Sequence, residues 1–89
     1  MDKPTFTGVL ETIVTGFEDP GFQAQMAKAQ AAGDVGRLMA LPLEVQTRAF
    51  ASVDLDVTSG VAAFKAAGRS FGADADVGPL LARMKAALA

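Results

Sequence analysis

Six large apolar side chains between Thr5 and Phe17 recur at helical spacing, and this stripe most constrains what the chain can fold into. They are Phe6, Val9, Leu10, Ile13, Val14 and Phe17, at positions i, i+3, i+4, i+7, i+8 and i+11. Each such side chain contributes roughly 1.5–3 kcal/mol when it leaves water. A helix with this stripe is therefore stable only if other segments of the chain cover it, and Thr5 is its expected N-cap.

The middle of the chain carries further helix signals. Asp19-Pro20 and Gly33 predict the start and the end of a helix over residues 20–32. Asp34 predicts the start of the next helix, and Pro42 predicts a break within it, because the residue before a proline is disfavoured in the α region. Two short helices are therefore expected between Asp34 and Val53, with Leu43, Phe50 and Val53 facing the core.

Residues 53–57 alternate between apolar and polar side chains, which is formally a strand pattern. No second alternating run exists to pair with it, so we expect an extended connector. Thr58 or Ser59 then caps a helix that ends at Gly68. Asp76 is expected to cap the last helix, whose stripe is Val77, Leu80, Leu81, Met84 and Leu88.

These signals predict an all-α fold, a compact bundle of five to six short helices that forms a single domain over residues 1–89. Apolar residues make up 51% of the chain, but 18 of them are alanine. Alanine favours helix and lets helices approach closely, but it adds little volume to a core. The core is therefore expected to be modest.

The absence of Cys, His, Trp and Tyr excludes thiolate and imidazole chemistry. Three acidic pairs (Glu18/Asp19, Asp54/Asp56 and Asp74/Asp76) each precede an expected helix, where negative charge complements the helix dipole. We therefore expect helix capping rather than a metal site. Neither catalytic residues nor a cofactor is predicted, and the chain is not expected to be an enzyme.

The net charge of −2, with both signs interspersed, gives no electrostatic reason to expect nucleic acid or a membrane as a partner. The N-terminal residues lack the pattern of a signal peptide, and no apolar run approaches ~18 residues, so a soluble cytoplasmic protein is expected. A helix-turn-helix DNA binder, built from residues 44–52 and 59–67, is a less favoured alternative because Asp54 and Asp56 would face phosphates.

The preferred hypothesis is a small interaction or adaptor module that binds a protein partner or forms a homodimer. The first and last helices hold the two strongest stripes, so part of one of them is the expected contact surface. The alternative is a binder of an apolar small molecule in a pocket lined by Phe and Met. The candidate interaction or pocket residues are Phe6, Phe17, Phe22, Met26, Met39, Phe50, Phe64, Phe71, Met84 and Leu88.

Overall fold

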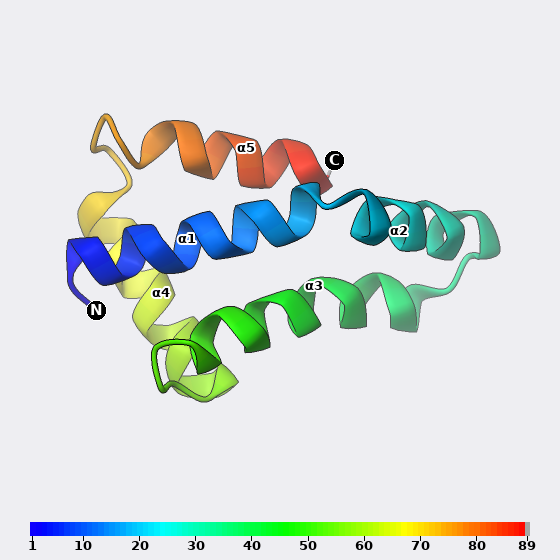
Figure 1. Ribbon diagram of the computed structural model, residues 1–89, viewed down its shortest axis with the longest axis horizontal. Coiled ribbons are helices and arrows are strands. Elements are labelled where there is room, and N and C mark those ends of the chain that lie inside the picture. Colours follow the sequence, from blue (N-terminus) through cyan, green and yellow to red (C-terminus); the bar gives the residue numbers. More distant parts are fainter. Residues whose placement is uncertain (89) are drawn as a thin grey trace.

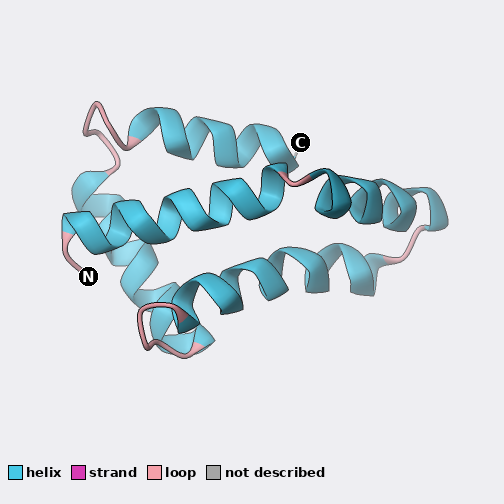
Figure 2. Ribbon diagram, viewed as in Figure 1, coloured by secondary structure: helices cyan, strands magenta, loops and turns pink. Residues whose placement is uncertain are grey.

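The computed structural model describes residues 1–88, and these residues form five α-helices and no strand (Figures 1 and 2). The helices are α1 (Lys3–Glu18), α2 (Pro20–Ala32), α3 (Val35–Ala51), α4 (Val57–Phe71) and α5 (Gly78–Leu88). The prediction of an all-α bundle of five to six helices is confirmed. No strand forms at residues 53–57, but the extended connector expected there is only partly right, because residues 52–54 form a turn with Asp54 at φ 60° and Val57 already begins α4.

Helix α1 is the centre of the molecule. It lies between α5 on one side and α3 on the other, while α4 crosses the end of the bundle where α1 begins and α3 ends (Figure 1). All six residues of the α1 stripe are at most 1% exposed. The expectation that other segments cover this stripe is therefore confirmed.

The core consists of two clusters that share α1. One cluster joins α1 to α2 and α3, and its largest members include Phe17, Phe22 and Phe50. The other joins α1 to α4 and α5 through Phe6. The Phe64 ring of α4 packs against both clusters, with its centroid 5.0 Å from that of Phe6 and 5.9 Å from that of Phe50. These contacts lie within the range in which aromatic pairs attract one another.

Aspartate begins four of the five helices. Asp2, Asp19, Asp34 and Asp56 each accept a hydrogen bond from the backbone N–H three residues later, at 2.7–3.1 Å. The predicted caps at Asp19 and Asp34 are confirmed, as is the end of α2 at Gly33, whose φ is 67°. The cap expected at Thr5 is wrong, as is the one at Thr58 or Ser59. In both places an aspartate three residues before Thr5 or Ser59 takes the cap, because a carboxylate satisfies the free N–H group and also complements the helix dipole.

Helix α3 is continuous through Pro42, so the predicted break into two helices is wrong. A proline inside a helix removes one backbone hydrogen bond, here to the carbonyl of Leu38, and disturbs the preceding turn. Leu41 and Val45 are both 5% exposed and pack into the same core cluster on either side of this position. Their burial holds the helical conformation across Pro42.

The register of the α3 core face also differs from the expectation. Leu41, Val45, Ala49 and Phe50 are its buried residues, whereas Leu43 is 48% exposed and Val53 lies beyond the helix, half-buried. The expected core face of Leu43, Phe50 and Val53 is therefore correct for Phe50, wrong for Leu43 and only partly right for Val53. The reason is the unbroken helix, which keeps Leu43 on the side opposite α1.

The α4–α5 connection also departs from the expectation. Helix α4 does not end at Gly68 but continues to Phe71, whose ring lies 6.0 Å from that of Phe6. Asp76 does not cap α5; its carboxylate instead lies 3.0 Å from the Lys3 ammonium, which also contacts Asp74 at 3.0 Å. These contacts fix the turn before α5 against the start of α1.

Candidate functional site

The first half of α3 presents three large apolar side chains to solvent. Val35 is 65% exposed, Met39 is 72% exposed and Leu43 is 48% exposed. They follow one another at i, i+4 and i+8, and therefore form a single ridge along the helix. With the half-buried Leu38, Pro42 and Gln46 they form one continuous surface, which we call the α3 outer face: Val35, Leu38, Met39, Pro42, Leu43 and Gln46.

The α3 outer face is uncovered because of the way the helices are arranged. The hairpin of α2 and the first half of α3 extends past the ends of α1 and α5 (Figure 1). Further along α3, Phe50 is 1% exposed because α4 packs against that end of the helix. Helix α4 does not reach the first half of α3, so Met39 and Leu43 keep their solvent exposure.

The α3 outer face carries no charged side chain. Arg37 is turned away from it and donates a hydrogen bond to the Gln25 side chain of α2 at 3.0 Å. Glu44 and Arg48 border the cleft between α3 and the α1–α2 junction. Glu44 and Arg48 also line the hollow between Leu43 and Gln25. The six residues of the α3 outer face are therefore uncharged, but charged groups border the face on its Leu43 side.

Two hollows flank the ridge. One, of about 470 Å³, lies beside Pro42 and is bordered by Met39, Leu43 and Gln46. The other, of about 650 Å³, lies between Leu43 and Gln25 of α2. The α3 outer face thus combines projecting side chains with shallow, open grooves, the relief into which another helix can pack.

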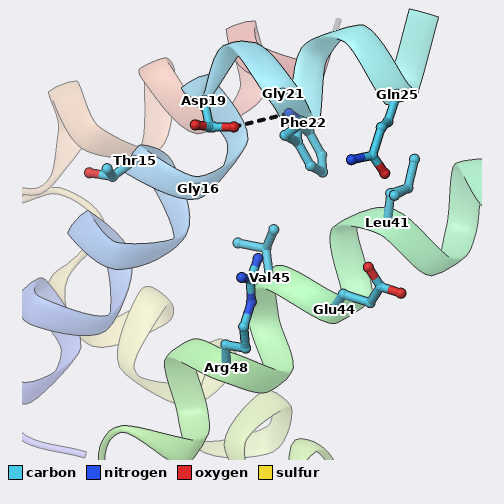
Figure 3. Close-up of a pocket in the computed structure, with 10 residues that line it drawn as sticks. All are labelled: Thr15, Gly16, Asp19, Gly21, Phe22, Gln25, Leu41, Glu44, Val45 and Arg48. Atoms are coloured by element: carbon cyan, nitrogen blue, oxygen red, sulfur yellow. Dashed lines mark hydrogen bonds between the residues drawn. The ribbon is translucent and has the colours of Figure 1, made fainter. Parts of the chain in front are cut away.

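A third hollow lies where α1, α2 and α3 meet (Figure 3). This cleft has a volume of about 430 Å³, and the Phe22 ring and Val45 form its apolar floor. Its rim is polar, with Asp19, Glu44 and Arg48 around it. Asp19 is already engaged as the α2 cap, since it accepts a hydrogen bond from the Phe22 N–H at 3.1 Å.

Most carboxylates of the chain have a structural role. Four of the ten acidic residues cap helices. Three more form ion pairs, namely Asp74 and Asp76 with Lys3 and Glu18 with Arg83 at 2.6 Å. Within residues 1–88, Asp, Glu, His and Cys side chains nowhere gather in groups of three or more that could hold a metal ion.

These ion pairs and caps shift the pKa values of exposed groups. Hydrogen bonding to Asp74 and then to Asp76 raises the pKa of Lys3, and the Lys3 ammonium lowers the pKa of Asp76. The hydrogen bond from Arg83 lowers the pKa of Glu18. At the caps, hydrogen bonds from Thr5 lower the pKa of Asp2, and the Ser59 N–H lowers that of Asp56.

Most candidate residues from the sequence lie inside the bundle. Phe6, Phe17, Phe22 and Phe50 are buried, and Met26, Phe64, Phe71 and Met84 are half-buried. Only Met39 and Leu88 are exposed, and they lie on different helices. Of the ten, Phe22 borders the junction cleft and Met39 borders the hollow beside Pro42.

The α1 stripe is covered within one chain and is therefore not free to form the contact surface expected on the first helix. On α5, Val77, just before the helix, is buried, Leu80, Leu81 and Met84 are half-buried, and only Leu88, 39% exposed, reaches the solvent. The residues that sequence reasoning missed are Val35 and Leu43. The signal that could have found them is the run from Leu38 to Leu43, six residues without a charge, which is too long for one buried face of a helix.

None of the helices formed by residues 1–88 is both long and apolar enough to cross a membrane. Comparison of the chain with protein-family models, with curated proteins and with solved structures found no match.

Proposed function

We propose that this protein is a non-enzymatic interaction module that binds another protein chain through the α3 outer face. The observation that carries the proposal is the ridge of Val35, Met39 and Leu43, which stands in solvent on a face without charges. A helix in a soluble domain normally turns its apolar stripe toward the core. Helix α3 has such a stripe at Leu41 and Val45 and carries this second apolar face in addition.

The chemistry of the face favours a protein as the partner. Apolar side chains in a central patch with polar groups at the rim are typical of protein interfaces. Gln46 and Thr47 at one end and Arg37 beside the other end supply such a rim. A partner helix that presents its own apolar side would bury the ridge in the manner of a helix in a groove.

The alternative of an apolar ligand enclosed by Phe and Met stays a prediction. The candidate rings lie against one another, with Phe17 and Phe22 stacked at 5.2 Å and Phe6 and Phe64 at 5.0 Å. Rings in contact leave no room for a ligand between them unless they move apart. The packing therefore favours a structural role for these side chains.

The proposal is tested by immobilising the wild type and the Leu43→Lys variant and comparing which proteins each captures from a cell extract. Mass spectrometry identifies the captured proteins. Each purified candidate is then titrated against both forms. We expect Leu43→Lys to abolish the specific captures, because a charge would then have to be desolvated in the centre of the contact. The control is Leu88→Lys, which adds the same charge at an exposed leucine of α5. The proposal would be refuted if the wild type and Leu43→Lys captured other proteins equally and also associated with themselves equally.

A further inference from the structure

We infer that the occupant of the α3 outer face is the same face of a second copy, so that two α3 helices pack antiparallel across a two-fold axis. This inference rests on the proposed function and specifies its partner. It is argued from the shape of the face, from its charge and from its size.

The shape of the face is self-complementary. In a two-fold contact each side must offer both the projecting and the receiving surface, because residue i of one copy meets residue j of the other and the reverse. The α3 outer face offers both, since Met39 and Leu43 project while the hollow beside Pro42 lies next to them. Met39 of one copy can therefore enter the hollow beside Pro42 of the other.

The spacing of the residues agrees with such a pairing. Val35, Met39, Pro42 and Gln46 follow one another at intervals of four, three and four residues, which is the spacing of a seam between two helices. An axis between Ala40 and Leu41 maps the face onto itself. It places Met39 opposite Pro42, Leu38 opposite Leu43 and Val35 opposite Gln46.

The charges permit a contact between identical copies. Between Pro20 and Gln46 the chain has two basic residues, Lys28 and Arg37, and two acidic residues, Asp34 and Glu44, so this part of the molecule has a net charge of zero. The next charge along the chain, Arg48, borders the hollow on the Leu43 side, so the net repulsion between two copies there is small. A face without charge also gives no basis for selecting an acidic or a basic foreign partner.

The size of the face predicts a weak dimer. The face spans twelve residues, about 18 Å of helix, and a stable interface needs roughly 800 Å² from each partner. That is a large share of a chain whose whole accessible surface is 5298 Å². One helix face belongs to the class of small, reversible contacts, and we expect dissociation in the range of roughly 10 to several hundred µM.

Sedimentation from about 5 µM to about 1 mM, combined with a charge exchange at Met39, tests the inference. The proposed axis brings the two copies of residue 39 close together, three positions apart along the paired helices. We expect Met39→Lys and Met39→Glu each to weaken self-association at least about tenfold, because like charges then face each other. A mixture of the two variants should associate again, and more tightly than either alone. Leu88→Lys is the matched control and should dimerise like the wild type.

The outcomes separate this inference from the proposed function. Wild-type protein that stays monomeric at 1 mM would overturn the dimer, and the proposed function would survive if Leu43→Lys still abolished binding to a different protein. Dimers that form equally in wild type, Met39→Lys and Met39→Glu would overturn the placement on α3. A mixture that associates no better than its components would overturn the two-fold arrangement. Circular dichroism of each variant, which should match the wild type, shows that the fold is intact.

Discussion

At the scale of the residue, two glycines allow neighbouring helices to approach closely. Gly16 of α1 lies against Val45 of α3, and a Cβ at Gly16 would come within 2.6 Å of Val45 Cγ1. Gly60 of α4 is buried beside the Phe50 ring, and a Cβ there would overlap the ring. These two glycines set how closely α3 approaches α1 and α4.

The pair Gly60 and Gly68 gives a matched prediction within one helix. Gly60→Ala should lower the free energy of unfolding by about 1–3 kcal/mol, because the added methyl group overpacks the core beside Phe50. Gly68→Ala places its methyl group where no atom lies within 4 Å, and it should raise the free energy of unfolding by about 0.5–1 kcal/mol through higher helix propensity. Urea unfolding followed by circular dichroism measures both. Similar changes in the two variants would contradict the packing at Phe50.

At the scale of the element, α3 is the helix with a proline in its interior and therefore a missing backbone hydrogen bond. Pro42 cannot donate the backbone hydrogen bond to Leu38, yet the helix runs unbroken from Val35 to Ala51. Tertiary burial of Leu41 and Val45 therefore outweighs the local preference of the sequence.

Replacement of Pro42 tests this balance. Pro42→Ala restores the missing N–H donor, and we expect it to raise the free energy of unfolding by about 1–3 kcal/mol, after allowance for the greater freedom of the unfolded chain. Pro20→Ala is the control, because Pro20 is at the first position of α2, where its missing donor costs nothing. Thermal unfolding at low protein concentration compares the two variants without any contribution from association. A destabilised Pro42→Ala variant would contradict the argument.

Helices α1 and α5 differ in how deeply their stripes are buried. Ile13 is 1% exposed, so Ile13→Ala should lower the free energy of unfolding by about 2–5 kcal/mol. Leu81 is half-buried, so Leu81→Ala should lower it clearly less. Urea unfolding checks the order of the two values. Equal costs would mean that α5 is more deeply packed than its exposure indicates.

The sequence predicts the helices better than it predicts the contacts between them. The α1 stripe, the start at Asp19-Pro20 and the end at Gly33 are local signals, and each was correct because short-range hydrogen bonds and sterics determine it. The continuity of α3 and the length of α4 depend on contacts with distant residues, such as Phe71 against Phe6, which spacing along the chain does not reveal. Of the ridge residues, the sequence predicts Met39 as a candidate but not Val35 or Leu43, and Leu43 looks like a core residue until the position of α4 is known.

At the scale of the whole molecule, charged side chains connect the two ends of the chain. Lys3 of α1 pairs with Asp74 and Asp76 before α5, and Glu18 at the other end of α1 pairs with Arg83 of α5. Gln23 of α2 also donates a hydrogen bond to the Ala87 carbonyl at 2.8 Å. These exposed contacts hold α5 in register along α1, while the half-buried apolar residues of α5 hold it in place.

These contacts predict how stability changes with pH. The folded state lowers the pKa values of Asp2, Asp56, Asp76 and Glu18. Their contribution to the free energy of unfolding is therefore fully present above the unfolded-state pKa, which is 3.8 for Asp and 4.5 for Glu. It is lost as the pH falls through the folded-state pKa values. Lys3 has a raised pKa, so its contribution is present below 10.5 and is lost as the pH rises through the folded value. We expect the free energy of unfolding to fall below about pH 4 and again above about pH 10.5.

The two caps separate this effect from general acid unfolding. In the double variant Asp2→Asn and Asp56→Asn, an amide oxygen can still accept from the N–H groups of Thr5 and Ser59, since asparagine is a good N-cap, but these two positions no longer titrate. The double variant should therefore lose less stability between pH 5 and pH 3 than the wild type, in urea unfolding measured at each pH. An acid profile identical to that of the wild type would show that the folded pKa values of Asp2 and Asp56 are not lowered, and the acid loss would then belong to Glu18 and Asp76, whose ion pairs join α5 to α1.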